Sequence, residues 1–251
     1  MKSLSILLLV MMSYTYSHAQ QANIRKELKK RTAEAGVYGG LGYYGNEHWG
    51  VGTNIHYLHG IGLRKQKFSF GCGLRINVFN SKKREYTTSS QRLTALNYGG
   101  ADSMYLPEVQ TNTLNAYFAF KYHLKRGVDI FFTTDLAGIN FADSKDGYFH
   151  SYETQRLPYP GIRYKTEPYA FNIRVPWSES YGTLVSELYG SFRLNKLLYW
   201  KLGFQYIRNE YKVDRNIPMN GKRFYQNQWM VTTGLTFDIR WPQNLAQAAY
   251  F

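Results

Sequence analysis

The sequence predicts an all-β fold, a closed antiparallel up-and-down β-barrel of about eight strands. Three observations favour it: an export signal at the N-terminus, long segments in which apolar and polar side chains alternate, and an alternation of short and long connections. The composition agrees, because the 251 residues include 23 Tyr and 22 Gly while the mean hydropathy is only −0.45. A barrel that shows apolar residues on one face only has this kind of composition.

The N-terminal residues have the three parts of a secretory signal peptide. Lys2 provides the positive charge, residues 4–12 (LSILLLVMM) form an apolar run, and Ser17 and Ala19 place small residues before a cleavage site. The run is shorter than the ~20 apolar residues that a transmembrane helix needs. We expect cleavage near Ala19 and Gln20, which leaves about 232 residues (251 − 19). With one cysteine, Cys72, the mature chain has no internal disulfide.

Eight segments show the two-residue period of a β-strand. Each has ~10–14 residues, which is enough to cross a hydrocarbon layer at a tilt of ~45°. Strands in soluble domains usually have only ~5–6 residues, so this length favours a transmembrane barrel. The segments are Ala35–Tyr44, Trp49–Ile61, Lys67–Phe79, Asn112–Leu124, Val128–Phe141, Gly182–Leu194, Leu198–Tyr211 and Asn227–Trp241.

The connections between these segments differ in length in a regular way. Short turns are expected at Lys125–Gly127 and Asn195–Leu197, whereas Asn80–Thr111 and Ala142–Tyr181 are long and Lys212–Gln226 is of medium length. Transmembrane barrels have short periplasmic turns, longer outer loops and, with an even strand number, both termini in the periplasm. The order of the connections therefore predicts the orientation of the barrel.

Four parts follow from this pattern. Residues 1–19 form the signal peptide, 20–34 a basic N-terminal periplasmic segment, 35–241 the barrel and 242–251 a C-terminal tail. Residues 20–34 suit either a short amphipathic helix or a solvated linker. A weak alternation in Tyr169–Val175 leaves a further hairpin, and thus ten strands, as the alternative.

The polar face of each predicted strand points into the barrel. An eight-stranded barrel is just wide enough for side chains to fill it, so charged residues inside must pair with one another. We expect a salt-bridged polar lumen, with a narrow, porin-like ion-conducting pore as the alternative. The inward-facing charged residues are Arg75, Lys121, Asp129, Asp135, Glu187, Arg193, Lys201, Asp238 and Arg240.

Aromatic residues fall near both ends of the strands. Amphipathic rings at these two levels are typical of the interfacial girdles of a membrane protein. The expected interface residues are Tyr43, Trp49, Tyr57, Phe68, Tyr122, Trp200, Tyr206, Trp229 and Trp241.

Together these features resemble the small OmpA/OmpX-type outer-membrane barrels and, more closely, the outer-membrane β-barrel domain proteins of Bacteroidota. The resemblance covers residues 35–241 and depends on the signal peptide, the eight strands and the loop lengths. Residues 233–241 (TGLTFDIRW) resemble the C-terminal signal that the barrel-assembly machinery reads, although about ten residues follow them. The resemblance implies an outer-membrane location in a Gram-negative cell envelope.

The expected function is structural or directed at surface interactions, without catalysis. The alternative is a lipid A-modifying barrel enzyme, for which His150, Ser151 and Glu153, with Asp143 and Asp146 nearby, are the candidates. Adjacent His and Ser on extended backbone point in different directions, so their spacing does not form a triad. No Cys, His and carboxylate cluster has the spacing of a zinc site, and neither a metal nor a cofactor is expected.

The net charge of +14 raises the question of partners. The basic residues are spread over turns and loops without a recognition helix, which argues against nucleic acid. Expected partners are membrane lipids and lipopolysaccharide at the rim, and the barrel-assembly machinery during biogenesis. The long segments are rich in Tyr, Arg and Pro, which favours an extracellular protein or ligand there as well.

Overall fold

The computed structural model describes residues 31–42, 48–61, 67–88, 102–150, 162–175, 180–217 and 221–239. Within these ranges the chain contains no helix that is long and apolar enough to span a membrane. The described residues form eleven antiparallel strands: β1 Arg31–Gly42, β2 His48–Ile61, β3 Phe68–Thr88, β4 Ser103–Lys125, β5 Val128–Asn140, β6 Lys145–His150, β7 Ile162–Pro168, β8 Phe171–Ile173, β9 Leu184–Arg193, β10 Leu198–Ile217 and β11 Gly221–Ile239.

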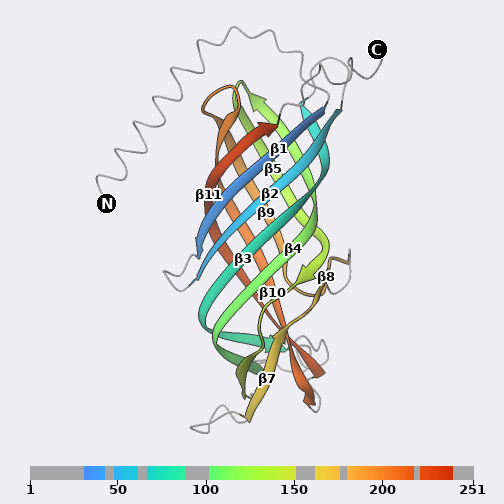
Figure 1. The fold of residues 1–251 in the computed structure, drawn as a ribbon, viewed down its shortest axis with the longest axis vertical. Helices are drawn as coiled ribbons and strands as arrows, with labels where there is room; N and C mark the ends of the chain where they lie inside the picture. The colour runs from blue at the N-terminus through green and yellow to red at the C-terminus, as the bar shows by residue number, and fades with distance from the viewer. Residues whose placement is uncertain are drawn as a thin grey trace, which may run out of the picture.

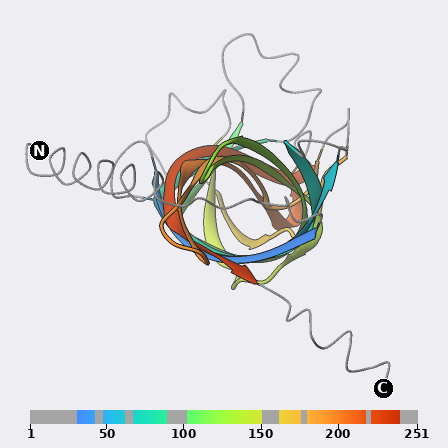
Figure 2. The ribbon, with the colours of Figure 1, turned by 90° about the horizontal axis from the view of Figure 1, so that it is seen from above.

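Eight of these strands close into a barrel in the order β1-β2-β3-β4-β5-β9-β10-β11. The ring closes where β1 pairs with β11, from Ala33↔Ile239 to Gly42↔Met230. The strands are steeply tilted (Figure 1), and the view along the axis shows a closed ring (Figure 2). The eight predicted segments are the eight strands of this ring, which confirms the predicted fold class. β1 begins at Arg31, inside the segment that was predicted to precede the barrel.

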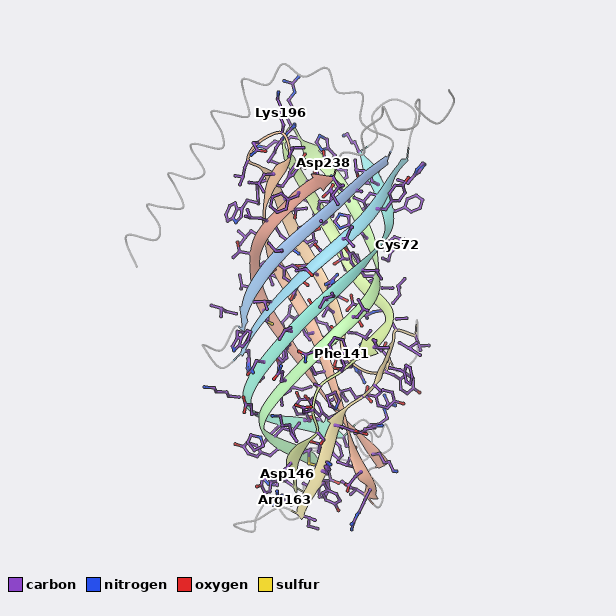
Figure 3. All side chains as sticks on the ribbon, viewed as in Figure 1. Cys72, Phe141, Asp146, Arg163, Lys196 and Asp238 are labelled. Atoms are coloured by element: carbon purple, nitrogen blue, oxygen red, sulfur yellow. The ribbon has the colours of Figure 1, made fainter. Side chains whose placement is uncertain are left out.

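Tight turns join strands at one end of the barrel, which we call the turn end. Arg126 and Gly127 connect β4 to β5, and Gly127 has a φ of 74°, in the left-handed region that glycine tolerates best. Between β9 and β10, Asn195 Oδ1 accepts hydrogen bonds from the backbone N–H groups of Leu197 (2.8 Å) and Leu198 (2.9 Å). Lys196 and Asp238 mark this end in Figure 3.

At the opposite end, strands continue beyond the barrel where the sequence predicts long loops. β3 and β4 remain paired as far as Thr87↔Ser103, β6 and β7 join β4 to β10, and β11 pairs with β3 at Phe224↔Thr88. The order β3-β4-β6-β7-β10-β11 therefore closes a second, six-stranded ring, which we call the outer ring (Figure 1, bottom). The expectation of an irregular loop over Asn80–Thr111 is wrong for residues 80–88 and 103–111, while residues 89–101 lie outside the described residues.

The outer ring has an apolar interior. The rings of Tyr86 and Tyr211 meet edge to face at 5.2 Å, and Phe149 and Tyr164 pack against the cluster from β6 and β7. Burial of this apolar surface holds the six strands together outside the barrel. Its buried members are Tyr86, Met104, Leu106, Val109, Tyr211, Val213, Ile217 and Phe224.

The segment predicted as an alternative hairpin adds no strand to the barrel ring. β9 pairs with β5 only as far as Thr134, and β8 pairs with the next part of β5, at Ala137↔Ile173 to Ile139↔Phe171. β8 thus takes the position beside β5 that β9 leaves vacant. The barrel ring has eight strands and not ten.

The outside of the barrel ring is a belt of exposed apolar side chains, which we call the apolar belt. An exposed apolar surface of this extent is unfavourable in water and favourable in a hydrocarbon layer. The belt contains Val37, Leu41, Val51, Ile55, Phe70, Leu74, Ile76, Phe118, Ile130, Phe132, Leu136, Ile139, Leu188, Phe204, Val231, Leu235 and Phe237.

Candidate functional site

The side chains inside the barrel form layers along its axis, and the layer nearest the turn end is charged. Lys121 Nζ lies 2.8 Å from Glu34 Oε1 and 3.0 Å from Asp129 Oδ2. His123 Nδ1 contacts Asp129, and His56 Nε2 lies 3.5 Å from Glu34 Oε2. Lys121 on β4 therefore links the carboxylates of β1 and β5.

An aromatic layer lies next to this charged layer. The rings of Phe131 and Tyr189 are stacked, with centroids 4.7 Å apart and planes only 5° from parallel. Tyr117 joins the two layers through a 2.9 Å hydrogen bond between its hydroxyl and His56 Nδ1. With the buried Leu58 and Ala119, these rings form one apolar cluster across the lumen.

Four charged side chains occupy the middle of the lumen, and we call them the buried quartet: Arg75, Asp135, Glu187 and Lys201. Arg75 Nε lies 3.5 Å from Asp135 Oδ1, and Arg75 Nη1 lies 3.8 Å from Glu187 Oε2. Lys201 Nζ lies 2.7 Å from Glu187 Oε1. These side chains come from β3, β5, β9 and β10 and are almost inaccessible to solvent, so two positive charges balance two negative charges in the interior.

Neutral donors bind one oxygen of each buried carboxylate, whereas Asp135 Oδ1 and two nitrogens of Arg75, Nε and Nη1, have no hydrogen-bond partner among the described residues. Asp135 Oδ2 accepts hydrogen bonds from Asn115 Nδ2 (2.7 Å) and from the backbone N–H of Val185 (2.8 Å). Glu187 Oε1 accepts a hydrogen bond from Gln205 Nε2 at 3.2 Å. A buried ion pair is tolerated only with additional hydrogen bonds of this kind, because both charges have lost their water.

Apolar and neutral polar side chains, among them Asn209 and Gln228, share the lumen between the buried quartet and the outer ring. Phe79, Val185, Ile207 and Met230 form one cluster, and the interior of the outer ring forms a second one beyond it. An ion leaving the quartet in this direction would have to pass two apolar clusters.

The structure describes eight of the nine predicted lumen charges and distributes them over three places. Six of them belong to the two clusters described above: Arg75, Lys121, Asp129, Asp135, Glu187 and Lys201. Arg193 lies at the turn end, where its Nε donates to the carbonyl of Asn195 (2.9 Å), and the partly buried Asp238 lies at the same end. Arg240 lies outside the described residues.

The sequence prediction omitted one charged lumen residue, Glu34. Glu34 was assigned to the segment before the barrel. It lies two and four residues before Gly36 and Tyr38 on the same strand, so the two-residue alternation points all three inward. The signal was present, but the predicted strand began one residue too late to include it.

The predicted interface aromatics lie on the outside of the barrel where they are described. Trp49, Tyr57, Phe68 and Trp229 are exposed, and Tyr122, Trp200 and Tyr206 are partly buried. Tyr206 and Trp229 pack against each other with ring centroids 5.0 Å apart, and Trp200 Nε1 donates to Thr233 Oγ1 (2.9 Å). Tyr43 and Trp241 lie outside the described residues.

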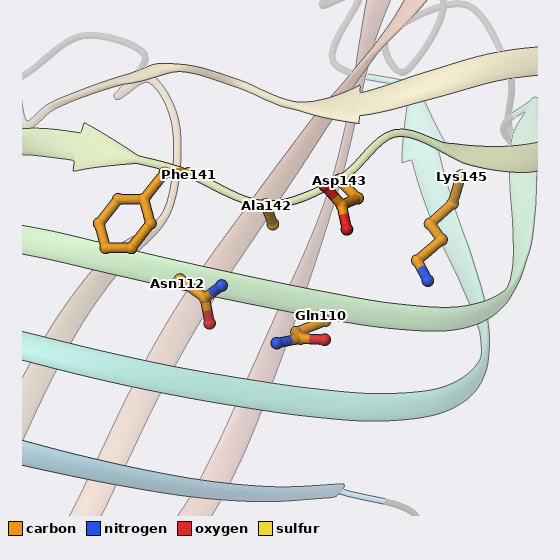
Figure 4. Close-up of a pocket in the computed structure, with 6 residues that line it drawn as sticks. All are labelled: Gln110, Asn112, Phe141, Ala142, Asp143 and Lys145. Carbon is orange, nitrogen blue, oxygen red and sulfur yellow. The ribbon is translucent and has the colours of Figure 1, made fainter.

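A groove of about 400 Å³ opens on the outside where the wall changes from eight strands to six (Figure 4). The backbone N–H of Phe141 donates to the carbonyl of Asn112 (2.8 Å), and the chain then leaves β4 until β6 begins. The groove is lined by Gln110, Asn112, Phe141, Ala142, Asp143 and Lys145. It has an apolar edge towards the apolar belt and charged side chains towards the outer ring.

The residues considered for catalysis do not come together in the part of the chain that the structure describes. His150 ends β6, Asp143 lines the groove, and Asp146 forms an ion pair with Arg163. Residues 151–161, which include Ser151 and Glu153, lie outside the described residues. The described side chains include no group of three His, Cys, Asp or Glu residues placed to hold a metal ion.

The fold thus defines a closed eight-stranded β-barrel with a filled polar lumen and an exposed apolar belt. No model of a known protein family matches the sequence. No curated protein matches it either.

Solved structures of outer-membrane proteins are similar at a low level. Neisserial surface protein A is 10% identical, with a TM-score of 0.31 over 83% of this chain and 96% of that one. Ail, the attachment invasion locus protein of Yersinia pestis, is 11% identical, with a TM-score of 0.32 over 84% and 100%. A major outer membrane protein from Thermus thermophilus is 11% identical, with a TM-score of 0.33 over 83% and 99%. The strand pairings, and not these alignments, establish the barrel.

Proposed function

We propose that this chain is an outer-membrane β-barrel protein that serves the structure of the envelope or interactions at its surface, without catalysis. The apolar belt supports the membrane location, because an exposed apolar surface around a closed barrel is stable in hydrocarbon. Transmembrane barrels have their short turns on the periplasmic side, so the turn end faces the periplasm and the outer ring faces the exterior. The export signal in residues 1–19 agrees with a location in the cell envelope.

The observation that carries the proposal is the filled lumen. The buried quartet is paired internally, and two apolar clusters separate it from the exterior. Among the described residues, paired charges and apolar clusters take up much of the lumen, which favours a structural barrel over the ion-conducting alternative. The outer ring, with its own apolar core, then serves as a rigid surface towards the exterior.

The location is tested by gel mobility of the protein from outer-membrane fractions, compared before and after boiling in detergent. A heat-dependent shift is expected, since a closed transmembrane barrel resists detergent until it is heated. A soluble periplasmic protein without such a shift would contradict the proposal.

The closed lumen is tested in planar lipid bilayers. The folded protein is expected to insert without producing single-channel current steps. Regular steps whose size changes in Asp135→Asn or Glu187→Gln would instead support a narrow pore. For the enzymatic alternative, the control is His150→Ala, which is expected to leave the lipid A mass spectrum unchanged.

A further inference from the structure

Two arginines lie close together on the outside of the barrel, just beyond the apolar belt. The segment after β7 stays beside β10, where Tyr169 N donates to the carbonyl of Glu210 (3.0 Å), and then crosses over to β5. This crossing places Arg174 beside β5 and β9, where its Nε donates to the carbonyl of Asp135 (2.8 Å) and its Nη2 donates to Ser186 Oγ (3.1 Å). Arg208 faces outward from the adjacent strand β10.

Two of the three guanidinium nitrogens of Arg208 have no hydrogen-bond acceptor among the described residues. Its central carbon lies 4.3 Å from the ring centre of Tyr225, while its Nε and Nη2 are buried and have no hydrogen-bond partner among the described residues. Leaving charged donors buried without acceptors is costly. These two nitrogens would gain acceptors if the Arg208 side chain turned outward to an anion at the surface of the barrel.

The nearby carboxylate does not supply this acceptor. Glu210 forms an ion pair with Arg223 and accepts a hydrogen bond from the backbone N–H of Gly182 (2.9 Å). Within the described ranges, neither Arg174 nor Arg208 forms an ion pair, and the two guanidinium groups repel each other. An anion bound between them would relieve this repulsion.

Arg208 also lies at a defined level of the barrel. The next outward-facing residue pair towards the turn end is Tyr206 and Trp229, which are directly opposite each other on β10 and β11. Beyond this pair, Phe204 and Val231 belong to the apolar belt. Amphipathic aromatic rings lie at the headgroup level of a bilayer, so the guanidinium group of Arg208 lies where lipid phosphates are found.

We propose that Arg174 and Arg208 bind the phosphate group of an anionic lipid headgroup in the outer leaflet. Guanidinium groups match phosphate oxygens in geometry and charge. A lipid is favoured over free phosphate because the exposed Trp229 and, beyond it, Phe204 provide an apolar surface for an acyl chain on the turn-end side of Arg208. This inference rests on the proposed membrane location.

The test compares the wild-type barrel in detergent micelles with the double variant Arg174→Gln/Arg208→Gln by native mass spectrometry. The probes are phosphorylated lipid A, enzymatically dephosphorylated lipid A and inorganic phosphate. The double variant loses the charged hydrogen bonds to the phosphate group, so it is expected to bind phosphorylated lipid A at least about tenfold more weakly. The matched control is Arg215→Gln in the outer ring, whose side chain is 84% exposed and which is expected to bind like the wild type.

Two results would overturn the proposal. One is an unchanged affinity of the folded double variant, with folding checked by heat-dependent gel mobility. The other is displacement of the lipid by millimolar inorganic phosphate, which would indicate a site for free phosphate. One comparison needs no variant. The wild-type protein should bind dephosphorylated lipid A about tenfold more weakly than phosphorylated lipid A. Cell fractionation tests the membrane location separately, so the two proposals fail in different experiments.

Discussion

Arg75 is the residue whose loss should affect the barrel most. Its guanidinium group lies between Asp135 and Glu187, and all three side chains are completely buried. Arg75→Met leaves the carboxylates with fewer positive neighbours, so we expect a loss of ~3–5 kcal/mol in the free energy of unfolding. Urea unfolding in detergent micelles, followed by gel mobility, measures this loss.

The double variant Arg75→Met/Asp135→Asn should recover part of the lost stability, because it removes one of the two buried negative charges. The control Arg215→Met removes an exposed arginine and should change stability by less than ~0.5 kcal/mol. Equal effects of Arg75→Met and Arg215→Met would show that the buried quartet does not stabilise the barrel.

At the far end of the molecule, an exposed ion pair should titrate without affecting stability. A hydrogen bond from Arg163 lowers the pKa of Asp146 in the outer ring (Figure 3). A carboxyl group with a lowered pKa contributes stability above its unfolded-state pKa, and this contribution disappears as the pH falls through its folded-state pKa. Because both side chains are solvated, the contribution is small.

We therefore expect Arg163→Gln to return the pKa of Asp146 towards its ordinary value, as measured by NMR titration of the carboxyl carbon. The unfolding midpoint at neutral pH should stay unchanged. A clear drop in that midpoint would mean that this pair organises the outer ring.

At the scale of elements, the outer ring should open independently of the barrel. Phe224 on β11 is completely buried in the apolar core of the outer ring. Phe224→Ala removes most of a large apolar side chain, which usually costs ~3–5 kcal/mol. We expect the outer ring to become sensitive to protease added outside intact cells, while the barrel keeps its heat-dependent gel mobility.

The control is Phe171→Ala, which truncates an exposed phenylalanine on β8 and should leave protease resistance unchanged. Loss of the gel shift in Phe224→Ala would contradict the independence of the two rings.

The strand extensions of the outer ring also show where the sequence pattern fails. On β3 the buried side chains lie at odd-numbered positions up to Ser81 and at even-numbered positions from Tyr86 onwards. On β4 the same switch falls between Leu106 and Val109. A test for a two-residue period assumes constant parity, so it ends at this change. Pro107 argues against a central strand. However, it lies in the stretch of β4 between the residues that pair with β5 and those that pair with β6. This stretch pairs only with β3, and such an edge tolerates proline.

For the whole molecule, the membrane location predicts a cost for charge on the apolar belt. Leu188 on β9 faces outward and is 53% exposed, so in a soluble barrel Leu188→Arg would cost almost nothing. In a bilayer, an arginine at the midplane costs ~2–4 kcal/mol. We expect this loss in reversible unfolding from lipid vesicles and none for Glu108→Arg, an exposed position of the outer ring. Equal stabilities of both variants and the wild type would argue against a bilayer around the belt.

The sequence by itself determined the eight barrel strands and which side chains of each strand point inward. The physical reason is local: a strand between hydrocarbon and a narrow polar lumen must alternate, and this alternation is visible without knowing any partner strand. The same alternation predicted an inward orientation for all four members of the buried quartet, Arg75, Asp135, Glu187 and Lys201.

Only the tertiary structure decided which of these residues meet. Arg75 reaches Asp135 and Glu187 because the closed, tilted ring brings β3, β5 and β9 together across the lumen. In the same way, the outer ring and the contact between Arg174 and Ser186 depend on where β5 and β9 end and the chain crosses over. Such contacts join residues far apart in the sequence, and strand alternation carries no information about them.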